Sequence, residues 1–202
     1  MSTPGPTKRI AIAGATGSIG RQALDVLAAH RERLTCVALT AGSDLEGVCQ
    51  LAQRLRPATL ALERTPDASA ARAALAAAAP GAEIHVGRGA AVRAIEAAAA
   101  DVVVNGIVGA AGLPASLAAL ETGARLALAN KESLVIGGEL VRAALARGGT
   151  LLPVDSEHSA ALQCLQGRPA AEVTRLTLTA SGGALRQHPD WRRATPAEVL
   201  AH

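Results

Sequence analysis

Residues 9–20 read RIAIAGATGSIG, a short apolar segment that runs into three glycines, each three residues from the next. The apolar residues are typical of a buried strand, and residues 18–29 have the apolar spacing of a helix. Gly14 permits a tight turn, Gly17 lets a pyrophosphate approach the backbone, and Gly20 allows close contact between helix and sheet. Because the glycines join a strand to a helix, the segment predicts a nucleotide-binding loop that opens a βαβ unit.

The alternation of strand and helix continues along most of the chain. Further strands are predicted at residues 35–40, 58–62, 83–86, 101–104, 125–129 and 150–154. Further helices are predicted at residues 44–55, 67–79, 90–99, 114–122 and 132–146. Strands joined by helices pair in parallel through right-handed crossovers. The predicted fold class is therefore α/β, with a Rossmann-like doubly wound parallel sheet.

The pattern changes after residue 154. A helical stretch at residues 155–165 is followed by a loop and by an alternating segment, residues 172–179, that predicts one more strand. We expect residues 1–8 to form a disordered tail and residues 9–154 to form a nucleotide-binding domain. Residues 155–202 would then begin a second domain, of the α+β class, that is truncated.

The composition restricts the class of protein. Half of the residues are apolar, Phe and Tyr are absent, and the net charge of +3 comes from cations scattered singly. Nucleic-acid sites favour basic runs and stacking aromatic residues, whereas mild basicity suits a phosphorylated ligand. No apolar run reaches membrane-spanning length, and no signal peptide is visible. The three cysteines include no CxxC pair and are expected to be reduced and mostly buried. We therefore expect a cytoplasmic protein that binds neither nucleic acid nor membrane.

The residues after the second predicted strand bear on the choice of cofactor. They read Ala41-Gly42-Ser43-Asp44. An acidic residue at this position often binds the ribose hydroxyls of NAD, whereas a 2′-phosphate favours cations. Asp44 could equally cap the next helix. The GxxGxxG spacing is common among NADP-dependent enzymes, but the residues by themselves leave the choice between NAD and NADP open.

Three further segments place polar groups at the ends of predicted strands. They are residues 105–113 (NGIVGAAGL), 128–135 (LANKESLV) and 153–160 (PVDSEHSA). The carboxyl ends of parallel strands are where open α/β sheets bind ligands. Of the twenty Lys and Arg residues, only Lys8 and Lys131 are lysines. Lys131 lies in the second segment, where a compact ammonium could donate to a substrate oxygen.

Two carboxylates lie close together in the third of these segments. Asp155 and Glu157 are two residues apart, so in an extended segment their side chains fall on one side. Hard cations such as Mg²⁺ and Mn²⁺ prefer carboxylate oxygens, although two carboxylates alone make a poor site. Each residue has another interpretation, since Asp155 could cap a helix and Glu157 could be a first-turn carboxylate favoured by the helix dipole.

Together with the glycine loop and residues 179–183 (TASGG), these segments resemble the 1-deoxy-D-xylulose 5-phosphate reductoisomerases. The resemblance extends from residue 10 to residue 202, with five motifs in the family's order. It implies an oxidoreductase that uses NADPH and Mg²⁺ or Mn²⁺ to isomerise and reduce 1-deoxy-D-xylulose 5-phosphate. The implied product is 2-C-methyl-D-erythritol 4-phosphate, an isoprenoid precursor of the non-mevalonate pathway. A homodimer is implied for the full-length enzyme.

The resemblance also assigns roles to individual residues. Those implied to contact the cofactor are Gly14, Thr16, Gly17, Ser18, Ile19, Gly42, Ser43, Asp44, Asn130 and Glu132. Those implied to contact the substrate are Lys131, Ser156, Glu157, Ser181 and His202. Asp155 and Glu157 would bind the metal, and with Lys131 they would be the catalytic residues. Many relatives carry a cation and an Asn where this chain has Ser43 and Asp44, so the preference for NADPH rests on the resemblance alone.

Two other functions are consistent with the glycine loop. Another NADP-dependent oxidoreductase, such as a semialdehyde dehydrogenase, would need a nucleophilic cysteine, and Cys164 lies in a helix with no matching motif. A non-catalytic nucleotide-binding module would not need residues 128–135 or 153–160. Because the family extends well beyond residue 202, we expect this chain, if it folds, to bind nucleotide but to turn over little or no substrate.

Overall fold

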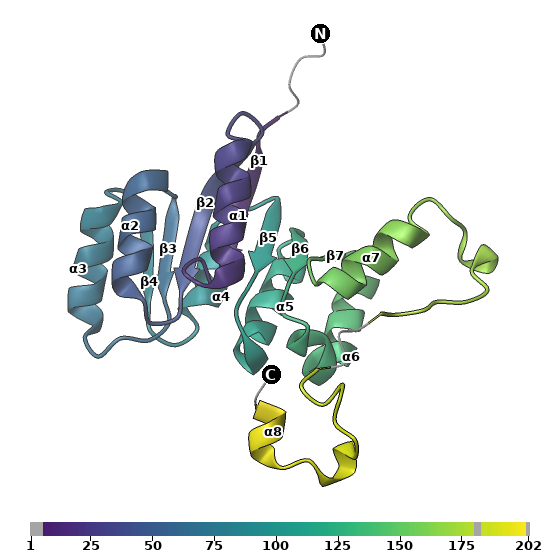
Figure 1. Ribbon diagram of the computed structural model, residues 1–202. Coiled ribbons are helices and arrows are strands. Elements are labelled where there is room, and N and C mark those ends of the chain that lie inside the picture. The colour runs from purple at the N-terminus through teal and green to yellow at the C-terminus, as the bar shows by residue number, and fades with distance from the viewer. Residues whose placement is uncertain (1–5, 180–182, 201–202) are drawn as a thin grey trace. The chain divides into compact units, whose positions relative to one another are not determined.

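The computed structural model describes residues 6–179 and 183–200, and the chain divides into two compact units. The first unit is Met1–Asp155 and the second is Ser156–His202. In the first unit, seven parallel strands form one sheet in the order β4-β3-β2-β1-β5-β6-β7 (Figure 1). The predicted α/β class, with a Rossmann-like parallel sheet, is confirmed.

The strands and α-helices of the first unit begin and end within two residues of the predicted bounds, whereas the 3-10 helix η1 was not predicted. The strands are β1 (Lys8–Ala13), β2 (Leu34–Ala41), β3 (Thr59–Leu62), β4 (Glu83–Val86), β5 (Val102–Asn105), β6 (Arg125–Leu128) and β7 (Thr150–Pro153). The helices are α1 (Ser18–Ala29), α2 (Leu45–Leu55), α3 (Ala68–Ala78), α4 (Ala90–Ala97), η1 (Gly109–Gly112), α5 (Leu113–Glu121) and α6 (Glu132–Ala146). Because Lys8 pairs with Leu34, β1 begins inside the segment that was predicted to be a tail.

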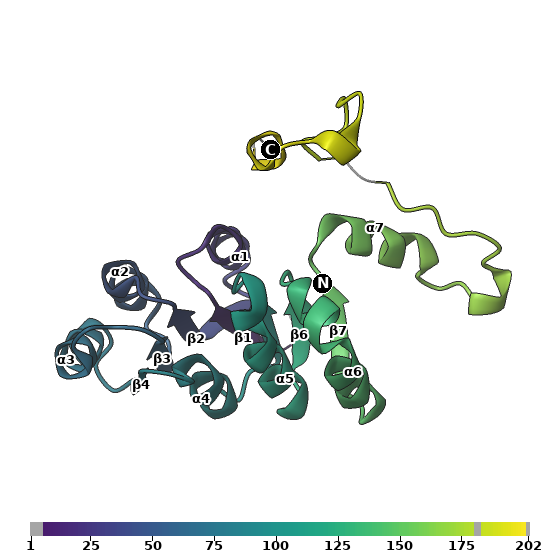
Figure 2. The same ribbon diagram turned by 90° about the horizontal axis from the view of Figure 1, so that it is seen from below.

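The helices cover the two faces of the sheet in two groups. Helices α1, α2 and α3 lie on one face, and α4, α5 and α6 lie on the other (Figures 1 and 2). Alternate residues of β1 supply both cores: Ile10 and Ile12 pack on the α1–α3 side, whereas Ala11 and Ala13 pack on the α4–α6 side. Small side chains let helices approach the strands closely, which explains how a chain without Phe or Tyr fills its core.

The order of the strands creates one position suited to ligand binding. From β1 the chain proceeds outward to β4, and it then returns to β5 on the other side of β1. In open α/β sheets, ligands bind at the carboxyl ends of strands where the order reverses in this way. The glycine loop follows β1, and residues 105–113 begin with the last residue of β5. Both segments therefore lie at the switch point of the sheet.

The second unit consists of short elements. They are α7 (Ser156–Leu165), η2 (Ala170–Glu172), η3 (Trp191–Arg193) and α8 (Pro196–Leu200). The strand predicted at residues 172–179 is wrong: residues 173–179 have no regular structure, and Leu176 and Leu178 are 55% and 59% exposed. Alternating apolar residues form a strand only where a neighbouring strand supplies hydrogen bonds. Among the described residues, no strand pairs with this segment.

Two expectations from composition can be compared with the structure. All three cysteines are free; Cys36 is buried and Cys49 is half-buried, but Cys164 is exposed. The expectation of burial is wrong for Cys164, because α7 has no buried residue. In the described part of the chain, no helix combines the length and apolar character that crossing a membrane requires.

Candidate functional site

The glycine loop after β1 is shaped by close backbone contacts. Gly14 has a φ of 80°, and a Cβ at that position would lie 3.1 Å from the carbonyl group of Gly106. A Cβ on Gly20 would lie 2.4 Å from the Gly14 carbonyl oxygen and 2.6 Å from Ala15. The Gly14 N–H donates to Thr40 Oγ1 at 3.2 Å, which anchors the loop to β2. The turn requires a glycine at position 14, as predicted. At position 20 a side chain would clash with the backbone of the loop, and not with the sheet as predicted.

The first turn of α1 has no side-chain cap, in contrast to the three helices that follow it. Gly17 occupies its N-cap position, and no acidic residue lies in the turn. The N-termini of α2, α3 and α4 bond the carboxylates of Asp44, Asp67 and Glu63 respectively. Uncapped N–H groups and the positive end of the helix dipole favour an anion. The segment from Thr16 to Ile19, predicted to bind a pyrophosphate, therefore lies where a phosphate group fits.

Two asparagines and two serines connect the ends of β5 and β6. Asn105 donates to Ser116 Oγ at 2.8 Å, and Ser116 Oγ lies 3.0 Å from Ser133 Oγ. The Asn130 side-chain oxygen accepts from the Ser133 N–H at 3.0 Å and from the Ser133 hydroxyl. All four residues are at most 3% exposed, so each bond is made out of contact with water. Sequence reasoning missed Ser116 and Ser133, because a serine within a helical pattern gives no sign of its partner.

The amide of Asn130 also shapes the turn after β5. Asn130 Nδ2 donates to the carbonyl groups of Ile107 at 2.7 Å and Gly109 at 2.9 Å, and to Glu132 Oε2 at 3.0 Å. These bonds fix the positions of Asn130 and Glu132 at the end of β6. Their contact with a cofactor stays a prediction.

Lys131 and Asp155 meet at the ends of two neighbouring strands, β6 and β7. Lys131 Nζ lies 3.1 Å from Asp155 Oδ2; the lysine side chain is 60% exposed and the aspartate side chain is 12% exposed. An ion pair with one exposed partner contributes little to stability. Two of the three predicted catalytic residues, 24 positions apart in the chain, are thus brought together at the carboxyl edge of the sheet.

The end of β2 distinguishes the two interpretations of Asp44. Its carboxylate accepts from the Gly47 N–H at 2.9 Å and caps α2. The capping interpretation is therefore confirmed. Gly42 and Ser43 precede the cap, and the Gly42 carbonyl accepts from the Arg64 N–H at 2.8 Å. Contact of Gly42, Ser43 and Asp44 with the adenosine end of a cofactor stays a prediction.

The remaining predicted residues belong to the second unit or lie outside the described residues. Glu157 is in the first turn of α7, where Ser156 Oγ donates to Glu157 Oε2 at 2.9 Å. Asp155 ends the first unit, so the two predicted metal ligands are described with different units. Ser181 and His202 lie outside the described residues. Within residues 6–179 and 183–200, no group of three His, Cys, Asp or Glu side chains is arranged to hold a metal ion. Metal binding by Asp155 and Glu157 stays a prediction.

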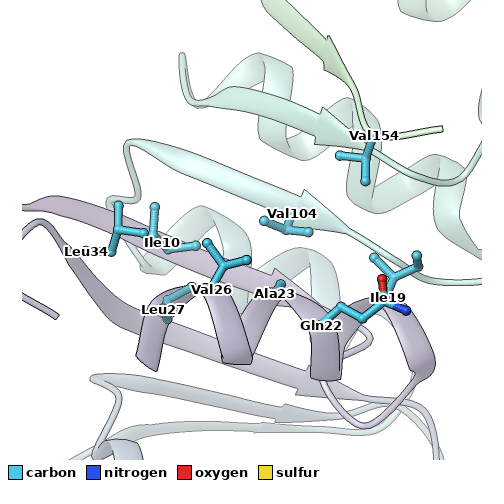
Figure 3. Close-up of a pocket in the computed structure, with 9 residues that line it drawn as sticks. All are labelled: Ile10, Ile19, Gln22, Ala23, Val26, Leu27, Leu34, Val104 and Val154. Atoms are coloured by element: carbon cyan, nitrogen blue, oxygen red, sulfur yellow. The ribbon is translucent and has the colours of Figure 1, made fainter. Parts of the chain in front are cut away.

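An apolar groove runs along α1 in the first unit (Figure 3). Its volume is about 320 Å³, and its lining includes Ile19 and Val26 of α1 and Val104 and Val154 at the ends of β5 and β7. Val26 is 53% exposed and Val154 is 42% exposed. Among the described residues of the first unit, 6–155, no helix covers β5–β7 on this face (Figure 2). Sequence reasoning missed this groove, because apolar residues on a helix are normally interpreted as core.

The Cys36 and Cys49 thiols are poor nucleophiles. Burial raises the pKa of the Cys36 thiol to about 12, and burial also raises the pKa of Cys49. Because the thiolate is the reactive form, neither residue suits the nucleophilic role that a semialdehyde dehydrogenase requires.

Two family models match the chain in succession. The model described as 1-deoxy-D-xylulose 5-phosphate reductoisomerase matches residues 10–138. The model described as the C-terminal domain of 1-deoxy-D-xylulose 5-phosphate reductoisomerase matches residues 151–202.

Curated relatives carry the same description. The 1-deoxy-D-xylulose 5-phosphate reductoisomerase of Leifsonia xyli subsp. xyli is 47% identical over 197 residues, which cover 96% of this chain and 48% of the relative. The enzyme of that description from Gloeobacter violaceus is 48% identical over 202 residues, which cover 96% of this chain and 50% of the relative. The chain spans about half the length of the curated relatives it matches.

Solved structures with the same fold contain ligands. The 1-deoxy-D-xylulose 5-phosphate reductoisomerase from Zymomonas mobilis in complex with NADPH matches with a TM-score of 0.80 at 37% identity, over 91% of this chain and 48% of that one. A DOX-P reductoisomerase in complex with NADPH, fosmidomycin and magnesium matches with a TM-score of 0.79 at 37% identity, over 89% of this chain and 47% of that one.

Proposed function

This chain belongs to the 1-deoxy-D-xylulose 5-phosphate reductoisomerase family, and we propose that it forms the NADPH-binding part of an enzyme with that activity. The complete enzyme would convert 1-deoxy-D-xylulose 5-phosphate to 2-C-methyl-D-erythritol 4-phosphate. It would require Mg²⁺ or Mn²⁺, and it would act as a cytoplasmic homodimer that binds neither nucleic acid nor membrane. Another NADP-dependent oxidoreductase fits less well, since both matching family models are those of the reductoisomerases, and neither Cys36 nor Cys49 suits the role of the nucleophilic cysteine.

One observation carries the proposal. The glycine loop, the Asn130 segment and the Lys131–Asp155 pair all lie at the carboxyl edge of one parallel sheet, after β1, β6 and β7. Open α/β sheets bind their ligands at this edge. A nucleotide on the α1 N-terminus would therefore lie on the same edge as the groups proposed to act on the substrate.

Each part of the site would contribute a distinct interaction. The uncapped first turn of α1 would bind the pyrophosphate, and the Asn105–Ser116–Ser133–Asn130 network would keep the neighbouring turn in place. Lys131, oriented by Asp155, would donate a hydrogen bond to a substrate oxygen as negative charge develops on it.

The carboxylates of Asp155 and Glu157 have the oxygen donors that Mg²⁺ and Mn²⁺ prefer, and waters and substrate oxygens commonly complete such a site. When bound, the ion would polarise the substrate carbonyl and hydroxyl oxygens, and NADPH would supply the hydride. Ser156, Ser181 and His202 would contact the substrate.

The first test compares binding with turnover in the 202-residue chain. We expect NADPH fluorescence to report saturable binding. We also expect the NADPH absorbance to stay constant with 1-deoxy-D-xylulose 5-phosphate and Mn²⁺, because these 202 residues span only about half the length of the relatives. Rapid turnover by this chain would refute the expectation of inactivity, and failure to bind NADPH would refute the proposed role.

The second test supplies the half of a relative that this chain does not span. In a chimera, residues 1–202 are followed by the remaining half of the Leifsonia xyli relative, and turnover is expected. Lys131→Ala should then reduce kcat by about 100-fold or more, as the loss of a preorganised donor does elsewhere. The control is Lys8→Ala, which removes the only other lysine. Lys8 is exposed and begins β1, at the opposite end of the strand from the carboxyl edge, so kcat should be unchanged. Equal activity of the two variants would exclude the proposed role of Lys131.

A further inference from the structure

We propose that Arg64 recognises the 2′-phosphate of NADPH and so determines the preference of this chain for NADPH over NADH. The proposal rests on the function above and adds a residue that lies outside every segment singled out from the sequence. Arg64 follows β3, whereas Gly42 and Ser43, expected to lie near the adenosine end of the cofactor, follow β2.

The pairing of β2 with β3 brings Arg64 to this position. Where the two strands end, the Glu63 N–H donates to the Ala41 carbonyl at 3.0 Å and the Arg64 N–H donates to the Gly42 carbonyl at 2.8 Å. Arg64 Nη2 lies 3.2 Å from the position that a Cβ on Gly42 would occupy. The guanidinium therefore lies against the bare backbone of the turn between β2 and α2, where a larger residue than glycine would displace it.

The neighbouring carboxylates are engaged elsewhere. Asp44 bonds the Gly47 N–H at the start of α2, and Glu63 bonds the Gly89 N–H at 2.6 Å at the start of α4. Glu63 and Arg64 are consecutive, so in an extended segment their side chains leave on opposite sides. Among the described residues, no carboxylate lies within ion-pair distance of the Arg64 guanidinium. Arg64 is exposed, so its guanidinium is accessible to an anion from solvent.

This arrangement matches the chemical difference between the two cofactors. At the end of the second strand, an acidic residue that accepts from the ribose hydroxyls favours NAD, whereas a nearby arginine accommodates the 2′-phosphate of NADP. Here the acidic residue, Asp44, caps a helix, and the arginine comes from the adjacent strand. The planar guanidinium can form two charge-assisted hydrogen bonds to a phosphate, and the exposed Ser43 hydroxyl can add a third.

The experiment measures equilibrium Kd values of the 202-residue chain for NADPH and NADH by fluorescence titration. The variants are Arg64→Met, which removes the charge, and Arg64→Lys, which keeps it. The matched control is Arg33→Met, because Arg33 is also exposed but precedes β2, at the opposite end of that strand. Thermal unfolding of each variant verifies that the fold is retained.

The proposal predicts a selective loss. Arg64→Met should raise the Kd for NADPH by about 10- to 100-fold, the range expected for hydrogen bonds to a charged group, and leave the Kd for NADH unchanged. The Kd of Arg64→Lys for NADPH should lie between those of Arg64→Met and the parent chain. The Kd of Arg33→Met for NADPH should equal that of the parent chain. The NADPH affinity of the parent chain should fall more steeply with salt than that of Arg64→Met.

Other outcomes would overturn the proposal. An unchanged NADPH affinity in Arg64→Met, an equal loss for both cofactors, or an equal loss in Arg33→Met would exclude recognition of the 2′-phosphate by Arg64. A parent chain that binds both cofactors equally would exclude it too, while leaving nucleotide binding intact. A parent chain that binds neither cofactor would instead remove the proposed function, and this inference with it.

Discussion

The two units of this chain differ in how completely they bury their own apolar residues. In the first unit, Leu39, Leu60 and Leu126 are fully buried between the sheet and its helices. In the second unit, no described residue is buried, and Leu178 and Trp191 are each 59% exposed. Successive βα repeats give the first unit partners that are close in sequence, whereas the short elements of the second unit supply no face for one another. The proposed cofactor site is therefore supported by a core, and the proposed metal and substrate residues beyond Asp155 are not.

The largest expected effect tests this difference in burial directly. Leu60→Ala, at a position that is 0% exposed, should lower the free energy of unfolding by about 2–5 kcal/mol through lost burial and the cavity left behind. Leu176→Ala, at a position that is 55% exposed, should change it by less than about 0.5 kcal/mol. Urea denaturation followed by circular dichroism measures both. Similar losses in the two variants would mean that the second unit has a core of its own.

A second pair of variants compares the effect of replacing one glycine in each unit by alanine. Gly20→Ala should destabilise the first unit by about 1–3 kcal/mol and abolish NADPH binding, because the new Cβ would lie 2.4 Å from the Gly14 carbonyl oxygen. Gly167→Ala places a Cβ in open space in the second unit, at a φ of 77°, so it should strain only its own turn. Urea denaturation measures the stability of each variant, and NADPH titration measures its affinity for the cofactor. Intact NADPH binding in Gly20→Ala would show that the loop can rearrange without loss of function.

The reactivity of one cysteine in each unit provides another comparison. Cys36 is buried in the first unit, with a pKa of about 12, so at pH 8 only about one thiol in 10,000 is the reactive thiolate. Cys164 is exposed on α7. A disulfide reagent at pH 8 should modify Cys164 within minutes and Cys36 only after unfolding, as peptide mapping by mass spectrometry can establish. Equally rapid modification of both would indicate that the first unit opens readily.

Burial of Cys36 also makes stability depend on pH. A free thiol has a pKa of about 8.5, so above that pH the unfolded chain releases this proton while the folded chain retains it. The stability associated with the protonated thiol is present below about pH 8.5 and is lost as the pH rises toward 12. Cys36→Ala should weaken the decrease in unfolding free energy between pH 8.5 and pH 10. An unchanged slope would contradict the burial of this thiol.

The smallest expected effects involve two carboxylates, half-buried Asp101 and exposed Glu198. The Asp101 carboxylate accepts hydrogen bonds from the Arg9 backbone N–H and from the Arg9 side chain, and these lower the pKa of Asp101, the backbone bond most strongly. The same bonds join β1 to the residue that precedes β5. The Thr195 backbone N–H, followed by its hydroxyl, lowers the pKa of Glu198 in the second unit. A carboxyl group whose pKa is lower in the folded chain than in the unfolded chain contributes to stability. This contribution is present above the pKa of the unfolded chain, near 4, and is lost as the pH falls. Asp101→Asn should slightly reduce global stability at pH 7 but not at pH 2, whereas Glu198→Gln should leave global unfolding unchanged at both. A larger effect of Glu198→Gln would mean that the second unit contributes to the cooperative fold.

The elements of the first unit were predictable because their signals are local. The run of apolar residues before Gly14 and the spacing of apolar residues in 18–29 depend on a few neighbouring positions, and each produced the predicted strand or helix. The same reasoning failed at residues 172–179. There the alternation is present, but a strand also needs a partner, and a partner is not encoded within the segment.

The sequence by itself determined the order of strands and helices, the glycine loop and the residues at the strand ends. Only the tertiary structure decided which strand ends are neighbours: Arg64 beside Gly42, Lys131 beside Asp155, and Asn105 linked through two serines to Asn130. The physical reason is that local backbone preferences act over a few residues. The neighbours of a side chain across a parallel sheet instead depend on strand order and register, which are set by the burial of the whole core.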